Sequence, residues 1–135
     1  MISVLVVDDH PIIRKSINQL LQETPDMRVT GEAENGAEAF QLVRENNYDV
    51  VVLDISLPEE HGIDVLKQLK NLRPDLHVLI LTMYPEEQYA VRSLKAGAAG
   101  YLNKHGALTQ LVTAVRQVAG GKKYISSELA LLLAD

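Results

Sequence analysis

The stretch that decides the fold lies at residues 2–11 and reads Ile-Ser-Val-Leu-Val-Val-Asp-Asp-His-Pro. Its first six residues are mostly aliphatic and β-branched, which is typical of a buried strand. The run ends in Asp8 and Asp9, and Pro11 suits the first turn of a helix. Two carboxylates about 4 Å apart repel by roughly 4 kcal/mol at an effective dielectric of about 20. A sequence that keeps them together either exposes both to water or uses them to bind a cation.

The same alternation of apolar run and helical pattern continues along the chain. The run at 50–53 is uniformly apolar and is expected at the centre of a sheet, whereas 27–33 is more polar and is expected at an edge. Apolar strands separated by amphipathic helices predict an α/β fold, a flavodoxin-like (βα)5 doubly wound parallel sheet with strand order 2-1-3-4-5. Strands are predicted at 2–7, 27–33, 50–53, 78–81 and 100–102, and helices from Pro11, around 39–43, after Gly62, at 86–95 and at 108–118.

Composition restricts the class of protein. The chain has 135 residues, which suits one domain, and is 47% hydrophobic but only 4% aromatic, so the core must be aliphatic. A formal net charge of −5 argues against a nucleic-acid surface on this chain. The lack of cysteine fits a reducing compartment, and no export signal or membrane-length apolar run is visible. A soluble cytoplasmic domain without membrane partners is expected.

Polar side chains follow four of the predicted strands. Asp8 and Asp9 end the first, Asp54 the third and Thr82 the fourth, and Lys104 follows the fifth. In a doubly wound sheet the carboxyl ends of the strands share one edge, where ligands bind. Three carboxylates beside one lysine make an anionic pocket, and Mg²⁺ is the natural hard counter-ion. Each of these residues alone has an ordinary explanation as a turn, cap or surface residue. Their occurrence together at one edge of the sheet predicts a cation-binding site.

The chemistry of such a site follows from its charges. With Mg²⁺ bound, a carboxylate can attack phosphorus and become an aspartyl phosphate. Asp54 is the best nucleophile because its strand is central. Phosphoryl transfer requires mainly positioning and neutralisation of charge, which Mg²⁺ and Lys104 would supply, with a hydrogen bond from the Thr82 hydroxyl.

The aspartates, the threonine and the lysine named above stand in motifs that resemble those of a response-regulator receiver domain of two-component signalling. The resemblance extends from residue 2 to about residue 125, and its last part resembles the NarL/FixJ subfamily, whose members usually carry a LuxR-type helix-turn-helix after the receiver. The motifs that carry it are Val6-Val7-Asp8-Asp9-His10-Pro11, Asp54-Ile55-Ser56-Leu57-Pro58 with Gly62, Leu81-Thr82, Lys95 to Lys104, and Gly120 to Ser126.

The resemblance implies a role for each residue of the acidic site. Asp54 would be the phosphoacceptor and a Mg²⁺ ligand. Asp9 would bind the ion directly, Asp8 largely through water, and Ser56 through its backbone carbonyl, so that the Ser56 side chain is free to vary. Lys104 would pair with the phosphoryl group.

The resemblance also implies a switch, partners and a domain layout. Thr82 would move to bind the phosphoryl group and Tyr101 would turn inward in response. The donor would be a sensor histidine kinase or a small acyl phosphate, and the protein would be no enzyme beyond catalysing its own phosphorylation and dephosphorylation. Homodimerisation on phosphorylation is a family-level expectation. Residues 1–120 would form the receiver. Residues 121–135, with a serine-capped helix from 126 whose leucines have no identified partner, would begin a linker to a DNA-binding domain outside this sequence.

Some residues depart from the family pattern or carry no expected role. His105 follows Lys104 where many receivers have proline, so a cis peptide bond is not implied there. The histidines His10, His61, His77 and His105 lack metal-ligand spacing and are expected to be surface or loop residues.

Three other functions share features with this sequence. A stand-alone receiver that signals by docking to a partner would have the same site. A flavodoxin-type FMN carrier would need glycine and hydroxyl residues where Asp8 and Asp9 would repel phosphate. A haloacid-dehalogenase-type phosphohydrolase shares the aspartate, Mg²⁺, threonine and lysine, but requires a second aspartate where this chain has Ser56.

Overall fold

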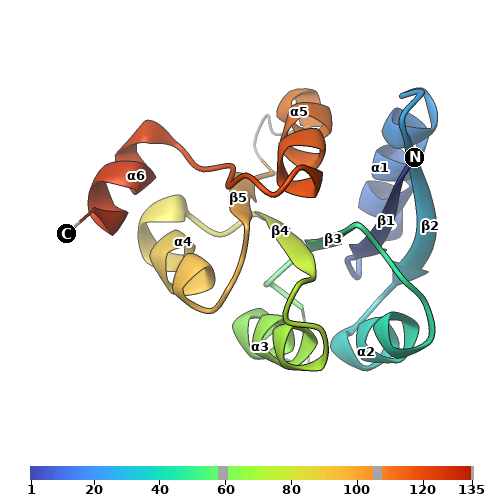
Figure 1. The fold of residues 1–135 in the computed structure, drawn as a ribbon, viewed down its shortest axis with the longest axis horizontal. Helices are drawn as coiled ribbons and strands as arrows, with labels where there is room; N and C mark the ends of the chain where they lie inside the picture. The colour runs from blue at the N-terminus through green and yellow to red at the C-terminus, as the bar shows by residue number, and fades with distance from the viewer. Residues whose placement is uncertain (58–60, 105–107, 135) are drawn as a thin grey trace.

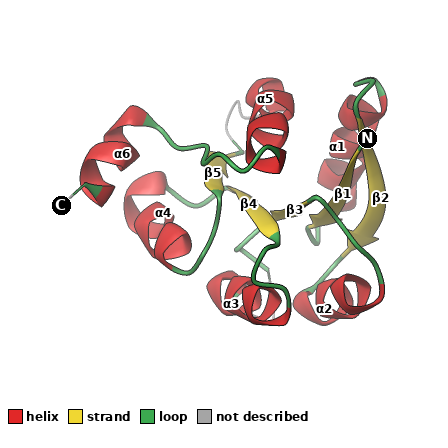
Figure 2. Cartoon of the chain, in the orientation of Figure 1, coloured by secondary structure: helices red, strands yellow, loops and turns green. Residues whose placement is uncertain are grey.

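Five parallel strands form a single sheet in the computed structural model, which describes residues 1–57, 61–104 and 108–134 (Figures 1 and 2). The strands lie in the order β2-β1-β3-β4-β5, so the predicted flavodoxin-like order is confirmed. The strands are β1 (Ile2–Val7), β2 (Met27–Ala33), β3 (Val50–Leu53), β4 (His77–Thr82) and β5 (Gly100–Asn103). The helices are α1 (Pro11–Gln22), α2 (Gly36–Glu45), α3 (Gly62–Leu72), α4 (Glu86–Lys95), α5 (Leu108–Ala119) and α6 (Ser127–Leu133).

The register of the strands fixes where the charged residues lie. Val7 of β1 pairs with Leu53 of β3, and Leu53 pairs with Ile80 of β4. The residues that follow Val7 and Leu53 therefore leave the sheet at the same level. The ladder continues one step beyond these pairs, because the Asp54 amide donates to the Val7 carbonyl over 3.0 Å.

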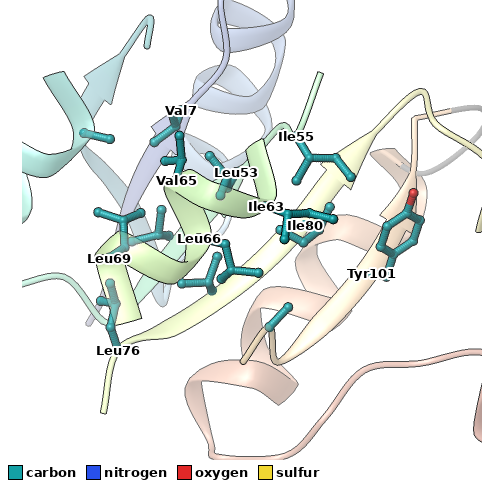
Figure 3. Close-up of a cluster of buried hydrophobic side chains, with 14 of the residues drawn as sticks. Val7, Leu53, Ile55, Ile63, Val65, Leu66, Leu69, Leu76, Ile80 and Tyr101 are labelled. Atoms are coloured by element: carbon teal, nitrogen blue, oxygen red, sulfur yellow. The ribbon is translucent and has the colours of Figure 1, made fainter. Parts of the chain in front are cut away.

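Neighbouring residues of each strand point to opposite sides of the sheet. Because the central strands are aliphatic at nearly every position, both faces of the sheet are apolar. In β1, Val4 and Val6 pack in one buried cluster with residues of α1 and α5. Leu5 and Val7 pack in the other with residues of α2, α3 and α4, part of which Figure 3 shows. Helices thus cover both faces, with α1 and α5 on one side and α2 and α3 on the other in Figure 1.

The observed helix starts refine the predicted ones. The Asn35 side chain caps α2 by accepting a hydrogen bond from the Glu38 amide over 2.9 Å, so this helix begins before the predicted 39–43. The third helix begins at Gly62 itself rather than after it. Pro58, Glu59 and the Lys104–His105 peptide bond lie outside the described residues.

The C-terminal residues pack against the rest of the domain. Tyr124 forms an isolated parallel bridge with Gly100, and α6 contacts α4. Leu129 of α6 is fully buried. The sequence predicted the serine-capped helix, and Ser126 does cap it, but the partner of its leucines was not foreseen. Leu129 packs in the same cluster as residues of α4, whereas Leu131 and Leu132 stay exposed, and no periodicity in the tail could have identified this partner.

Gly62 gives a test of how tightly the loop after β3 is held against α3. A Cβ at this position would lie 2.1 Å from the Ile55 Cα. Ile55 Cα is a backbone atom, so it cannot move away without displacing the chain. We expect Gly62→Ala to lower the free energy of unfolding by about 2 kcal/mol or more, measured by urea denaturation. Gly120→Ala is the control, since its nearest neighbour would be 3.5 Å away. Equal stability of the two variants would contradict the close approach.

Candidate functional site

Lys104 joins the tips of two neighbouring strands. Its Nζ lies 2.7 Å from Asp8 Oδ2 and 2.8 Å from Asp54 Oδ2. Asp8 and Asp54 are 2% and 1% exposed, so these charges are paired with one another rather than solvated. Asp8 follows β1, Asp54 follows β3 and Lys104 follows β5. The predicted convergence of charges at the carboxyl edge of the sheet is thus present in the structure.

Asp54 is held as a carboxylate by its neighbours. Its Oδ1 accepts hydrogen bonds from the Ser56 amide over 2.8 Å and from the Ser56 hydroxyl over 2.6 Å. Burial acts to raise the pKa of Asp54, but the hydrogen bonds from Lys104 and Ser56 outweigh it and lower the pKa below its ordinary value. Asp54 is therefore ionised at neutral pH, the form that a nucleophile requires.

Lys104 is held as an ammonium by the same contacts. Burial alone would lower the pKa of Lys104, and the hydrogen bonds to Asp54 and Asp8 raise it above its ordinary value. Its amide also donates to the Thr82 carbonyl over 2.7 Å, which fixes the start of its side chain against β4. A fixed positive charge thus lies beside the ionised Asp54 carboxylate.

The acidic residues offer ligand atoms for a cation. Asp8, Asp9, His10 and Asp54 each contribute one such atom, and these atoms lie within 4.8 Å of one another. Opposite ligands of one small divalent ion are separated by about 4 Å, so a small adjustment would bring these atoms around one ion. Asp9 Oδ1 is buried and accepts no hydrogen bond from the described residues. A buried carboxylate oxygen that accepts no such hydrogen bond, with His10 Nδ1 3.3 Å away, fits a site for a hard cation such as Mg²⁺.

His10 and the Ser56 hydroxyl belong to this site, although the sequence interpretation gave neither side chain a role. His10 is half exposed, as a surface residue should be, but its Nδ1 lies 2.7 Å from Asp8 Oδ1 and 3.3 Å from Asp9 Oδ1. The position of His10, directly after the two aspartates, was the one signal that could have indicated this contact. For Ser56 the signal was its spacing of two residues from Asp54, which suits a side-chain turn.

Thr82 and Tyr101 lie beside the charged cluster, but their hydroxyl groups are hydrogen-bonded to the backbone of Tyr84. Thr82 is fully buried, and its hydroxyl accepts a hydrogen bond from the Tyr84 amide over 3.4 Å. The Tyr101 ring is 2% exposed, and its hydroxyl donates to the Tyr84 carbonyl over 2.8 Å. Figure 3 shows this ring at the edge of the aliphatic cluster. The backbone of Tyr84 thus connects the two predicted switch residues.

The lowered pKa of Asp54 predicts how stability depends on pH. Because the folded-state pKa lies below the unfolded value, ionised Asp54 stabilises the fold above the unfolded pKa, and this contribution is lost as pH falls through the folded pKa. We expect the free energy of unfolding to fall more steeply below about pH 4 for the wild type than for Asp54→Asn, measured by urea denaturation at several pH values. The exposed Asp64, replaced by asparagine, is the control. Parallel pH profiles for wild type and Asp54→Asn would contradict the prediction.

The geometry of the sheet and its acidic edge defines a class of protein. Residues 4–116 match the family model of the response regulator receiver domain, and the chain belongs to this family. It is 39% identical over 134 residues to the response regulator GacA of Pseudomonas aeruginosa, covering 99% of this chain and 63% of GacA. It is 37% identical to the response regulator UvrY of Escherichia coli strain K12, covering 99% of this chain and 62% of UvrY.

The structural comparison gives the same result. A two-component response regulator of the LuxR family from Aurantimonas sp. SI85-9A1 superposes with a TM-score of 0.89 at 32% identity, covering 98% of this chain and 94% of that one. These relatives support the NarL/FixJ subfamily that the sequence resembles, and they make the chain a signalling domain of the two-component type. The chain spans less than two thirds of the length of GacA and UvrY. Within the described residues, every helix is too short or too polar to cross a bilayer.

Proposed function

We propose that this receiver domain accepts a phosphoryl group on Asp54 from a sensor histidine kinase in a reaction that depends on Mg²⁺. The observation that carries the proposal is the contact of Lys104 Nζ with Asp54 Oδ2 at 2.8 Å and with Asp8 Oδ2 at 2.7 Å. It supports an ionised nucleophile with a fixed positive charge beside it. Membership of the receiver family supports the choice of a histidine kinase as partner.

Four residues would hold the metal ion. Asp9 and Asp54 would bind it directly, Asp8 would act largely through water, and the Ser56 backbone carbonyl would complete the protein ligands. The strongest support from the structure is Asp9 Oδ1, which is buried and accepts no hydrogen bond from the described residues. When bound, the ion would neutralise charge on the phosphoryl oxygens and offset the repulsion between the carboxylates.

The residues of the chain perform the transfer itself. An oxygen of the Asp54 carboxylate attacks phosphorus, and the bond from phosphorus to the donor imidazole nitrogen breaks, with its electron pair leaving on that nitrogen. Lys104 then pairs with the transferred group, which becomes a new acyl phosphate. The Thr82 hydroxyl moves from the Tyr84 amide to a phosphoryl oxygen, and Tyr101, which is already buried and bonded to the Tyr84 carbonyl, keeps its inward position. Return of the phosphoryl group to water would be assisted by the same residues.

Signal output is proposed by analogy with longer relatives. GacA and UvrY extend well beyond the part matched here. We place the receiver at residues 1–120 and the start of a linker at 121–135, followed in the whole protein by a DNA-binding domain that controls transcription. Homodimerisation on phosphorylation would transmit the signal. A stand-alone receiver that docks to a partner protein is the alternative with the same site.

The phosphohydrolase alternative is disfavoured by Ser56. That class requires a second carboxyl group two residues after the nucleophile to protonate the leaving group. In this chain the position holds a hydroxyl that donates to Asp54 Oδ1 over 2.6 Å. Such a group supports the nucleophile and provides no general acid.

The test is incubation of the chain with acetyl phosphate and MgCl₂, followed by intact-mass spectrometry. We expect a gain of one phosphate that disappears when EDTA replaces Mg²⁺. No gain under either condition would contradict the proposal. A parallel assay with p-nitrophenyl phosphate separates the alternatives, because multiple turnovers would favour a phosphohydrolase over a receiver.

A further inference from the structure

The segment 122–133, here named the C-terminal strap, covers part of the edge of the sheet. β5 is an edge strand, and its outer groups would otherwise face solvent. The Tyr124 amide donates to the Ala99 carbonyl over 2.9 Å, and the Tyr101 amide donates to the Tyr124 carbonyl over 3.2 Å. The approach is so close that a Cβ on Gly100 would lie 2.7 Å from the Tyr124 carbonyl oxygen. The glycine at position 100 therefore accommodates the strap.

The second half of the strap is anchored on α4. The Ser126 hydroxyl accepts a hydrogen bond from the Leu129 amide over 3.0 Å and donates to the carboxylate of Glu86 in the first turn of α4. Leu129 is fully buried and belongs to the same apolar cluster as Ala90 and Leu94 of α4. Figure 1 shows α6 lying alongside α4.

Tyr101 is the junction between the strap and the phosphorylation site. Its amide is bonded to the strap, its ring belongs to the cluster that contains Leu129, and its hydroxyl is bonded to the Tyr84 carbonyl. The amide of the same Tyr84 is bonded to the hydroxyl of Thr82. One short chain of contacts thus leads from the residue proposed to bind the phosphoryl group to the C-terminal strap.

We propose that docking of the strap on β5 and α4 is coupled to the inward position of Tyr101, so that the strap reports the state of the phosphorylation site. This inference rests on the proposed function, because phosphorylation is the event that would further favour the inward position of Tyr101 seen in the structure. Coupling between two sites is reciprocal. A phosphoryl group that favours the inward ring should strengthen docking of the strap, and a loosened strap should weaken binding at the phosphorylation site.

The test uses the full chain and beryllofluoride with Mg²⁺ as a non-covalent phosphoryl mimic. Leu129→Ala removes the buried anchor, and Leu131→Ala, at a residue that is 73% exposed on the same helix, is the matched control. We expect Leu129→Ala to speed hydrogen exchange across residues 122–134, to shift the Tyr101 ring resonance, and to weaken beryllofluoride binding about fivefold or more. Leu131→Ala should change none of these. In the wild type, beryllofluoride should slow exchange in the strap.

The outcomes separate this inference from the proposed function. A freed strap with an unchanged Tyr101 resonance and unchanged beryllofluoride affinity would overturn the coupling and leave phosphorylation of Asp54 intact. Failure of the wild type to bind beryllofluoride would count against the proposed function, and the Tyr101 resonance in Leu129→Ala would then decide the coupling alone. If Leu129→Ala does not fold, Ser126→Ala removes the cap and the Glu86 contact, with the exposed Ser127→Ala as its control.

Discussion

The variant Asp54→Asn should lose the phosphate that the wild type gains from acetyl phosphate and Mg²⁺. The amide cannot act as the attacking carboxylate, and it removes a negative charge from the proposed metal site. Asp8 also contacts Lys104, but Asp54 is the carboxylate at the tip of the central strand β3, so we expect it alone to be the nucleophile. Intact-mass spectrometry after a fixed incubation measures the effect, and the modified fraction should fall by at least about tenfold.

The control for this experiment is Asp64→Asn. Asp64 lies in the first turn of α3 and is exposed, so its replacement should leave the phosphate gain unchanged. A gain that survives in Asp54→Asn would move the nucleophile to another residue. Circular dichroism of both variants would exclude loss of the fold as the cause.

The variant Lys104→Ala should be the most destabilising change at the site. It would leave the buried carboxylates of Asp8 and Asp54 without the ammonium that both contact. Removing one partner of a buried ion pair costs about 3–5 kcal/mol, because an uncompensated charge remains buried. We expect a loss of about 3 kcal/mol in the free energy of unfolding at neutral pH, measured by urea denaturation, with Mg²⁺ restoring part of it.

The restoration by Mg²⁺ is the specific part of that prediction. A cation bound between the carboxylates would replace the missing charge, so the same Mg²⁺ concentration should stabilise Lys104→Ala more than the wild type. Lys67→Ala, at an exposed lysine of α3, is the control and should change stability little with or without the ion. A stability of Lys104→Ala equal to that of the wild type would show that Lys104 does not balance the two aspartates.

Much of the fold could be predicted because the apolar or polar character of each strand agrees with its position in the sheet. The strand 50–53 is apolar at every position, and this is what a central parallel strand covered on both faces requires. The more polar β2 pairs on one side only, with β1. The predicted strand order then brought Asp8, Asp54 and Lys104 together without any information on contacts.

The details that escaped prediction depend on side-chain orientation or on distant contacts. The contact of His10 with Asp8 depends on the backbone turn after β1, and the Ser56 hydroxyl bond to Asp54 depends on the turn after β3. A sequence gives the residue types of such turns but not the direction of each side chain. The docking of α6 on α4 joins residues about 40 positions apart, so helical periodicity in the tail could not specify it.

The most direct test of the central claim is to locate the phosphoryl group after reaction with acetyl phosphate and Mg²⁺. Borohydride reduction of the acyl phosphate, proteolysis and tandem mass spectrometry would identify the modified residue. We predict that the modification is confined to Asp54 at the tip of β3. Modification of Asp8, Asp9 or His10 instead, or of a residue away from this edge of the sheet, would contradict the assignment of Asp54 as the phosphoacceptor.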